Sequence, residues 1–143
     1  MRLAIGLAQG LALYALQENQ DVLDPALRTA LTTTLVYVPV MVVGGIGAFR
    51  WLTLGVWTFV GVLIAAGLSW YEVSRLGGEE RYSYGPQAIY FIVPLLLFVG
   101  HHLIQAADEA RRWFAPYERY FDLGWRHGAQ LLLAILFTGA FWA

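Results

Sequence analysis

The stretch LTLGVWTFVGVLIAAGLSW, residues 52–70, decides the fold class of this chain. It carries no charged side chain and consists mostly of Leu, Val, Ile, Gly, Ala and aromatic residues. The hydrocarbon core of a bilayer is roughly 30 Å thick, and an α-helix with a rise of 1.5 Å per residue needs about 20 apolar residues to cross it. The stretch therefore predicts a transmembrane helix.

Other apolar runs of similar size flank this one. They cover residues 31–49, residues 87–107, and the end of the chain from residue 125 or 128 to 143. A fifth run, residues 3–16, is shorter and contains Gln9, so it is either a short span or the apolar region of a signal peptide. We expect a span, because Arg2 is the only basic residue at the start and no Ala-x-Ala-like cleavage pattern follows.

Composition places the whole chain in the membrane. Of its 143 residues 59% are hydrophobic and 13% are charged, and this leaves too little polar chain to cover four apolar helices in water. All nine basic residues are arginines, ten acidic residues nearly balance them, and no long run of one sign suggests a nucleic-acid partner. The absence of cysteine excludes disulfides, thiolate nucleophiles and thiolate metal ligands.

The predicted fold is therefore all-α, a polytopic transmembrane helical bundle forming a single domain over residues 1–143. We expect about five membrane helices and one short interfacial amphipathic helix. The membrane helices are predicted near residues 2–17, 25–49, 52–71, 86–114 and 125–143, and the interfacial helix near residues 116–123.

Local signals support these bounds. Asp24-Pro25 is typical of an N-cap followed by proline at the first helical position, and Gly85-Pro86 marks the start of the fourth helix in a similar way. Only Arg50 and Trp51 separate the second and third apolar runs, which predicts an antiparallel hairpin whose helices pack side by side. Gly124 is a candidate end for the interfacial helix.

The arginines predict the orientation. An N-terminus in the cytoplasm gives six arginines inside and three outside, as the positive-inside rule favours. The inner set is Arg2, Arg50, Arg111, Arg112, Arg119 and Arg126, and the outer set is Arg28, Arg75 and Arg81. We therefore expect a multi-pass membrane protein with its N-terminus in the cytoplasm.

The most polar feature is the segment HHLIQAADEARR at residues 101–112. On a helix its side chains form one ordered polar face. His101, Gln105, Asp108 and Arg112 share a stripe, and His102 and Glu109 lie on a neighbouring one. These six residues form a candidate polar site.

Three interpretations of this polar face remain open. Its histidines and Gln105 can hydrogen-bond to neighbouring helices while Asp108 and Glu109 pair with Arg112, which is a packing role. The same side chains can relay protons or a solute, because ionisable groups inside a membrane are often functional. Metal binding needs a further ligand such as His127, since adjacent histidines point about 100° apart on a helix.

Aromatic residues dominate the segment that follows. Pro116 breaks the preceding helix, and the next residues place aromatic side chains on one face of a short helix. We expect this segment to anchor the chain at the headgroup level of the bilayer, although a partner or substrate site is the alternative. The predicted anchor consists of Trp113, Tyr117, Tyr120, Phe121 and Trp125.

No motif specifies an enzyme or a cofactor. The chain has no P-loop, no G-x-S-x-G and no H-E-x-x-H. We therefore assign no catalytic residue, no cofactor and no metal ligand from the sequence.

Two segments resemble a known family. They are RLAIGLAQGLALYAL, residues 2–16, and FVGHHLIQAADEARRWFAPYERYFDLGWRHGAQL, residues 98–131. In them the chain resembles the N-terminal region of an uncharacterised bacterial multi-pass membrane family, domain-of-unknown-function family 4153. The resemblance implies an inner-membrane protein with further helices downstream, and it implies no activity or substrate. Because the chain stops in the apolar run FTGAFWA, we expect it to be part of a longer member.

The function expected from the sequence is a membrane-embedded module of a larger protein or assembly, of unknown biochemical activity. Its partners would be the lipid bilayer and either further transmembrane helices or other copies of the chain. One alternative is part of a solute or proton transporter that uses His101, Gln105 and Asp108 below Pro94. A second alternative is a metal-dependent membrane enzyme that uses His101, His102, Asp108 and His127.

Overall fold

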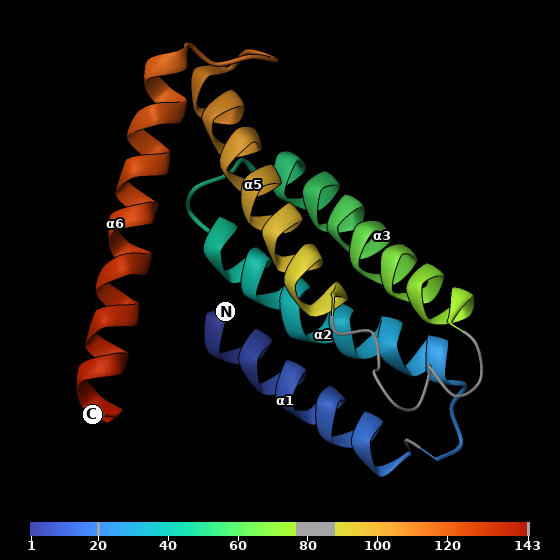
Figure 1. The fold of residues 1–143 in the computed structure, drawn as a ribbon. Helices are drawn as coiled ribbons and strands as arrows, with labels where there is room; N and C mark the ends of the chain where they lie inside the picture. Colours follow the sequence, from blue (N-terminus) through green and yellow to red (C-terminus); the bar gives the residue numbers. More distant parts are fainter. Residues whose placement is uncertain (20, 77–87, 143) are drawn as a thin grey trace. The chain divides into compact units, whose positions relative to one another are not determined.

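The computed structural model describes residues 1–19, 21–76 and 88–142, and within these ranges the chain is helical without β-strands (Figure 1). The helices are α1 (Arg2–Glu18), α2 (Pro25–Gly45), α3 (Trp51–Arg75), α5 (Ile89–Ala110) and α6 (Tyr117–Trp142). The predicted all-α class is confirmed. The predicted helix start at residue 86 lies outside the described residues.

The chain divides into two compact units. The first comprises Met1–His101 and the second His102–Ala143, so α5 begins in the first unit and ends in the second. The two units are described separately below.

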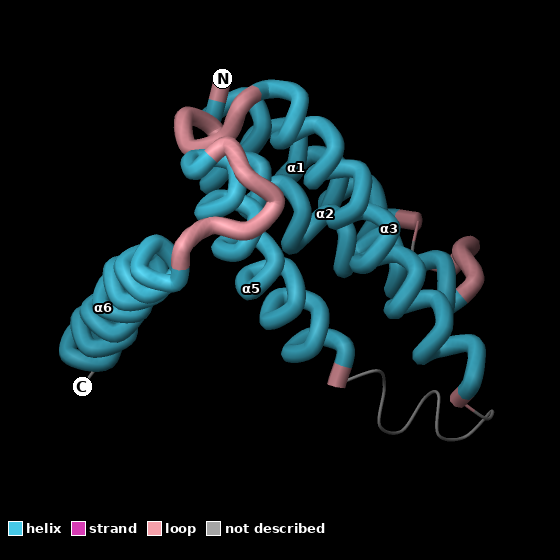
Figure 2. The backbone as a smooth tube through the Cα atoms, turned by 90° about the horizontal axis from the view of Figure 1, so that it is seen from above, coloured by secondary structure: helices cyan, strands magenta, loops and turns pink. Residues whose placement is uncertain are grey.

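Helices α2 and α3 lie side by side and antiparallel in the first unit, as the sequence predicts (Figure 2). The predicted N-cap of α2 is also confirmed. The Asp24 carboxylate accepts hydrogen bonds from the backbone N–H groups of Ala26 at 2.9 Å and Leu27 at 3.3 Å, and Pro25 occupies the first helical position. These bonds satisfy two of the donors that every helix start leaves open.

The turn between α2 and α3 is longer than predicted, because α2 ends at Gly45 and not near residue 49. Gly47 has a φ of 91°, a left-handed conformation that glycine adopts without a steric penalty. The turn folds Phe49 back onto the helix end, where a Cβ on Gly45 would lie 2.8 Å from the Phe49 ring and 2.6 Å from Leu54. Burial of Phe49, which is 8% exposed, therefore favours the early helix end.

One face of α3 forms the centre of the first unit. It carries the buried residues Leu54, Trp57, Gly61, Ala65, Ser69 and Val73 at helical spacing. A Cβ added at Gly61 would lie 2.9 Å from the Met41 side chain of α2 and 3.5 Å from Leu97 of α5. Small residues on this face thus bring neighbouring helices close, as expected where no hydrophobic force drives helices together in lipid.

Helix α1 lies along α2 and buries no side chain of its own. Two hydrogen bonds to backbone carbonyls join them. Arg2 Nη2 donates to the Ile46 carbonyl at 2.9 Å, and Gln9 Nε2 donates to that of Val36 at 3.3 Å. Arg2 therefore lies beside the turn between α2 and α3, which ends at Arg50.

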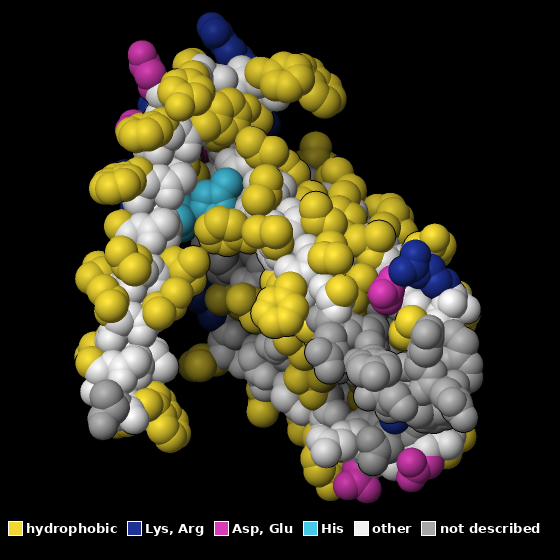
Figure 3. Space-filling view, viewed as in Figure 1, with side chains coloured by type: hydrophobic (Ala, Val, Ile, Leu, Met, Phe, Trp, Pro, Cys, Tyr) yellow, Lys and Arg dark blue, Asp and Glu magenta, His cyan; other side chains and the backbone are white. Residues whose placement is uncertain are grey.

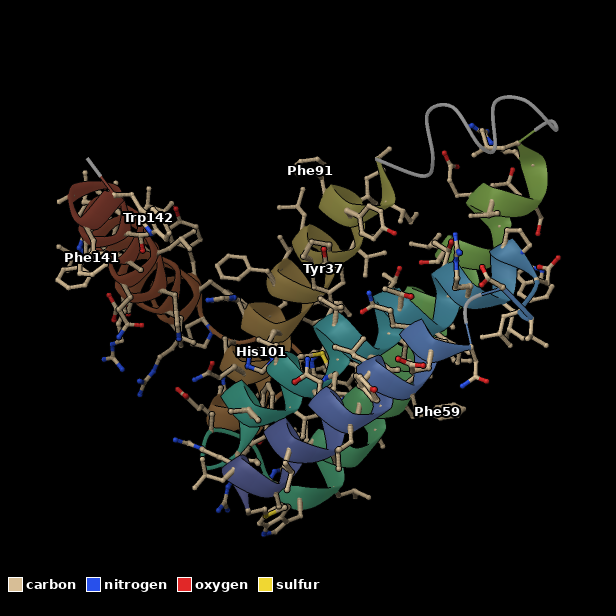
Figure 4. The ribbon with its side chains drawn as sticks, turned by 90° about the horizontal axis from the view of Figure 1, so that it is seen from below. Tyr37, Phe59, Phe91, His101, Phe141 and Trp142 are labelled. Atoms are coloured by element: carbon tan, nitrogen blue, oxygen red, sulfur yellow. The ribbon has the colours of Figure 1, made fainter. Side chains whose placement is uncertain are left out.

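Within the described residues, α2, α3 and α5 are long and apolar enough to cross a membrane. Their outward side chains are large and apolar. Phe59 is 64% exposed and Phe91 is 77% exposed, and both point away from the neighbouring helices (Figure 4). Figure 3 shows apolar side chains over most of the visible surface of α5 and α6. Such a surface is stable in lipid, so this is a membrane protein.

The spans predicted for the two ends of the chain stay predictions. Helix α1 has only 17 residues, and the first half of α6 carries several charged side chains. The predicted division of the C-terminal region into a helix near residues 116–123 and another near residues 125–143 is wrong, since α6 is continuous from Tyr117 to Trp142. A single glycine such as Gly124 costs a helix only about 1 kcal/mol, which the neighbouring helix formers outweigh.

Candidate functional site

His101 belongs to the first unit and is half-buried near the turn between α2 and α3 (Figure 4). Its ring centroid is 4.7 Å from that of Phe49, with the rings inclined at 64°. A Cβ at Gly44 would lie 3.9 Å from His101 Nε2, an ordinary van der Waals distance, so this part of α2 lies against the imidazole. His101 is therefore held by an aromatic edge and by a small residue of α2.

The rest of the polar segment belongs to the second unit, and α5 ends inside it. Arg111 has a φ of 51° and directly follows the last helical residue, Ala110. The N–H of Arg111 donates to the Asp108 carbonyl at 3.2 Å, and that of Arg112 to the Ala107 carbonyl at 3.1 Å. These two bonds form a Schellman motif, which terminates a helix.

This helix end corrects two predictions. The fourth helix ends at Ala110 and not near residue 114. Arg112 consequently lies beyond the helix, and helical spacing no longer aligns it with Asp108. Local sequence did not reveal this end, because glycine is the usual residue in the left-handed position and an arginine occupies it here.

Two carboxylates of the predicted site have different surroundings. Glu109 is exposed and accepts a hydrogen bond from Gln105 Nε2 at 3.0 Å, one helical turn away. Asp108 is buried, with 8% of its surface exposed. Gln105 and Glu109 therefore form a local pair on the helix surface, whereas the Asp108 side chain is withdrawn from solvent.

His102 meets His127 of α6 inside the second unit. The ring centroids are 4.4 Å apart and the rings are perpendicular. His127 Nδ1 lies 3.0 Å from the Leu123 carbonyl oxygen, which can only accept, so this nitrogen carries a proton. The sequence named His127 only as an additional metal ligand. Among the described residues no group of three or more His, Asp or Glu side chains could hold a metal ion.

A small hydrophobic core joins the end of α5 to the start of α6. Ala106, Ala115 and Leu123 are buried there, with Ala110 and Tyr120 packed against them. The Tyr120 hydroxyl accepts a hydrogen bond from the backbone N–H of Ala115 at 3.0 Å. Alanines at positions 106 and 115 allow the turn to approach the helices closely.

The predicted aromatic anchor separates into exposed and packed members. Trp113, Tyr117, Phe121 and Trp125 are 95%, 78%, 58% and 73% exposed. Tyr120 is half-buried against the small core. The four exposed rings are available to a headgroup region, and their role as an anchor stays a prediction.

Sequence reasoning missed several residues that shape these sites. Phe49 and Gly44 surround His101, yet both come from a different part of the chain. Trp57 packs against Gly100, one residue before His101. Small residues such as Gly44 and Gly100 permit close approaches between membrane helices, but they do not identify the side chain that approaches.

These features define an all-α membrane protein with polar side chains clustered around the end of α5. Comparison with known proteins found no matching family model, no matching curated protein and no matching solved structure. Its function must therefore be argued from its own residues.

Proposed function

We propose that this chain is a helical module of the bacterial inner membrane, with its N-terminus in the cytoplasm, and that it forms the membrane-embedded part of a larger protein or assembly. The observation that carries the proposal is the outward apolar surface of α2, α3 and α5. In each of these helices, no more than 33% of the most apolar 18-residue stretch is buried inside the chain. The remaining surface requires lipid or further helices around it.

The distribution of arginines supports the orientation. Arg2 and the α2–α3 turn lie at one end of the first unit, joined by the bond from Arg2 to Ile46. Arg28 and Arg75 lie at the other end, where the acidic residues Glu18, Asp21, Asp24 and Glu72 also gather. If α5 crosses the bilayer, the arginines that follow it lie on the side of Arg2.

The exposed end of α6 supports a role inside a larger assembly. Leu131, Leu132 and Leu133 are consecutive and each is more than half exposed, so apolar side chains point in several directions around this helix. Further helices of a longer chain or of a second copy would cover it. The resemblance to domain-of-unknown-function family 4153 remains a prediction that agrees with this role.

Cysteine labelling in intact cells tests the orientation, because the chain has no native cysteine. We expect Asp21→Cys to react with a membrane-impermeant maleimide from outside and Arg119→Cys to react only after permeabilisation. Labelling of Arg119→Cys from outside, with Asp21→Cys reacting only after permeabilisation, would show that the topology is the reverse of the proposed one. Recovery of the protein in the soluble fraction would refute membrane insertion.

The same assay separates a packing role for His101 from a transport role. His101→Cys should stay unlabelled if the half-buried side chain is packed between helices and has no access to water. Rapid labelling by the water-soluble reagent would reveal a hydrated path into the membrane, and the transporter alternative would then replace the proposal.

A further inference from the structure

A cavity of about 340 Å³ opens between α1 and α2 at the end of the first unit that carries the acidic residues. It is lined by Leu13, Leu16 and Gln17 of α1 and by Arg28 and Thr32 of α2. Its volume falls within the range of small-molecule sites. None of the predictions from sequence includes this cavity, and it lies far along α2 from the turn beside His101.

Three side chains that line the cavity carry hydrogen-bond donors: Arg28, Gln17 and Thr32. Among the described residues, no hydrogen bond or ion pair involves the guanidinium of Arg28, the amide of Gln17 or the hydroxyl of Thr32. Other polar side chains of α1 and α2 do form hydrogen bonds. The hydroxyls of Thr29, Thr33 and Thr34 each donate to the carbonyl four residues earlier, at 2.9, 2.8 and 2.7 Å. Gln9, the other glutamine of α1, donates to the Val36 carbonyl.

The charge of the lining selects the ligand. Among the described residues that line the cavity, Arg28 contributes a positive charge, Gln17 and Thr32 contribute further donors, and none is a carboxylate. Asp24, one turn before Arg28, already accepts the N–H groups of Ala26 and Leu27. A planar guanidinium with neutral donors beside it suits a phosphate oxyanion.

The order of the side chains along the helices adds an orientation. Arg28 and Gln17 lie near the helix ends, whereas Thr32 and Leu13 lie four residues, or about 6 Å, deeper along the helices. Leu13 and Leu16 line the α1 side of the cavity. Arg28 and Gln17 near the helix ends suit a phospholipid headgroup at the membrane surface, and Leu13 and Leu16 on the α1 side suit an acyl chain directed inward.

We propose that this cavity is a binding site for an anionic phospholipid, with the headgroup phosphate held by Arg28, Gln17 and Thr32 and an acyl chain along Leu13 and Leu16. The site explains why an arginine faces a gap between two membrane helices without a protein partner in the described ranges. It also gives α1, which buries no side chain of its own, additional contact with α2 through lipid.

Lipid retention measured by native mass spectrometry tests the proposal on the full chain. The protein would be purified from membranes, supplied with phosphatidylglycerol or phosphatidylcholine, and compared with Arg28→Gln and Arg75→Gln. Arg75 is the matched control, since it lies at the same end but on α3, where it pairs with Glu72 at 3.6 Å. We expect selective retention of phosphatidylglycerol by the parent and Arg75→Gln, and retention on the order of tenfold weaker in Arg28→Gln.

A second variant separates the site from the net charge of the molecule. Gln17→Leu keeps every charge and should weaken retention several-fold, while circular dichroism checks that each variant is folded. Equal loss in Arg28→Gln and Arg75→Gln, equal retention of both lipids, or displacement by millimolar inorganic phosphate would each overturn the proposal. The last result would assign the cavity to a free anion.

Discussion

Replacement of Gly100 by alanine tests the packing of α5 against α3. A Cβ at this position would lie 2.5 Å from Cη2 and 3.0 Å from Cζ2 of Trp57, which is closer than carbon atoms approach in folded proteins. Trp57 is itself buried, with 5% of its surface exposed, so its ring has little room to move. The added methyl group must therefore displace the indole or separate the helices.

Two opposing effects set the size of the change. Alanine stabilises a helix interior by up to about 1 kcal/mol relative to glycine, whereas overpacking a close contact costs about 1–3 kcal/mol. Gly67 of α3 provides the control, because nothing lies within 4 Å of a Cβ built there. We expect Gly100→Ala to be less stable than Gly67→Ala by about 1–3 kcal/mol.

The free energy of unfolding would be measured in mixed micelles by titration with a denaturing detergent, followed by circular dichroism. A double-mutant cycle with Trp57→Phe then identifies the cause, since the smaller ring should make alanine at position 100 harmless. Equal stabilities of Gly100→Ala and Gly67→Ala, or a cycle without coupling, would refute the close contact between α5 and α3.

Three further predictions concern the helix ends. Arg111→Gly should stabilise the chain by about 1 kcal/mol, because the φ of 51° at this position strains any residue with a Cβ; a lower unfolding free energy than the parent would contradict the strained turn. Asp24→Ala should destabilise α2 by about 0.5–2 kcal/mol and Asp24→Asn should restore most of the loss, since asparagine also caps. If the two variants unfold alike, the cap is not responsible. Tyr120→Phe removes the acceptor for the Ala115 N–H and should accelerate hydrogen exchange of that amide, with an equilibrium loss of about 0.5–1.5 kcal/mol. Unchanged exchange at Ala115 would argue against this hydrogen bond.

Much of the fold is predictable because it depends on short stretches of chain. In lipid a segment must satisfy its own backbone hydrogen bonds, so an uncharged apolar run such as residues 52–70 has helix as its only stable form. The N-cap at Asp24 follows from two adjacent residues. The side-by-side packing of α2 and α3 follows from the short connection between them.

The helix ends were less predictable, because each depends on how the segment after the helix folds back against it. Helix α2 ends early where Phe49 returns to Gly45 and Leu54. Helix α5 ends at an arginine in a left-handed conformation, next to a core that Ala115 and Leu123 complete from the following segment. The apolar pattern of each helix does not reveal that the following residues fold back onto its end.

The candidate polar site was likewise predictable only in part. Sequence spacing is enough to predict that His101 through Glu109 present polar groups on a membrane helix, because this spacing and the apolar residues before it are local. The folded chain was needed to show that Arg112 lies beyond the helix, that His102 contacts His127, and that Arg28 lines a cavity between α1 and α2. The physical reason is that each of these depends on where a second segment of chain comes to lie, and that position is set by packing and not by the residues on either side.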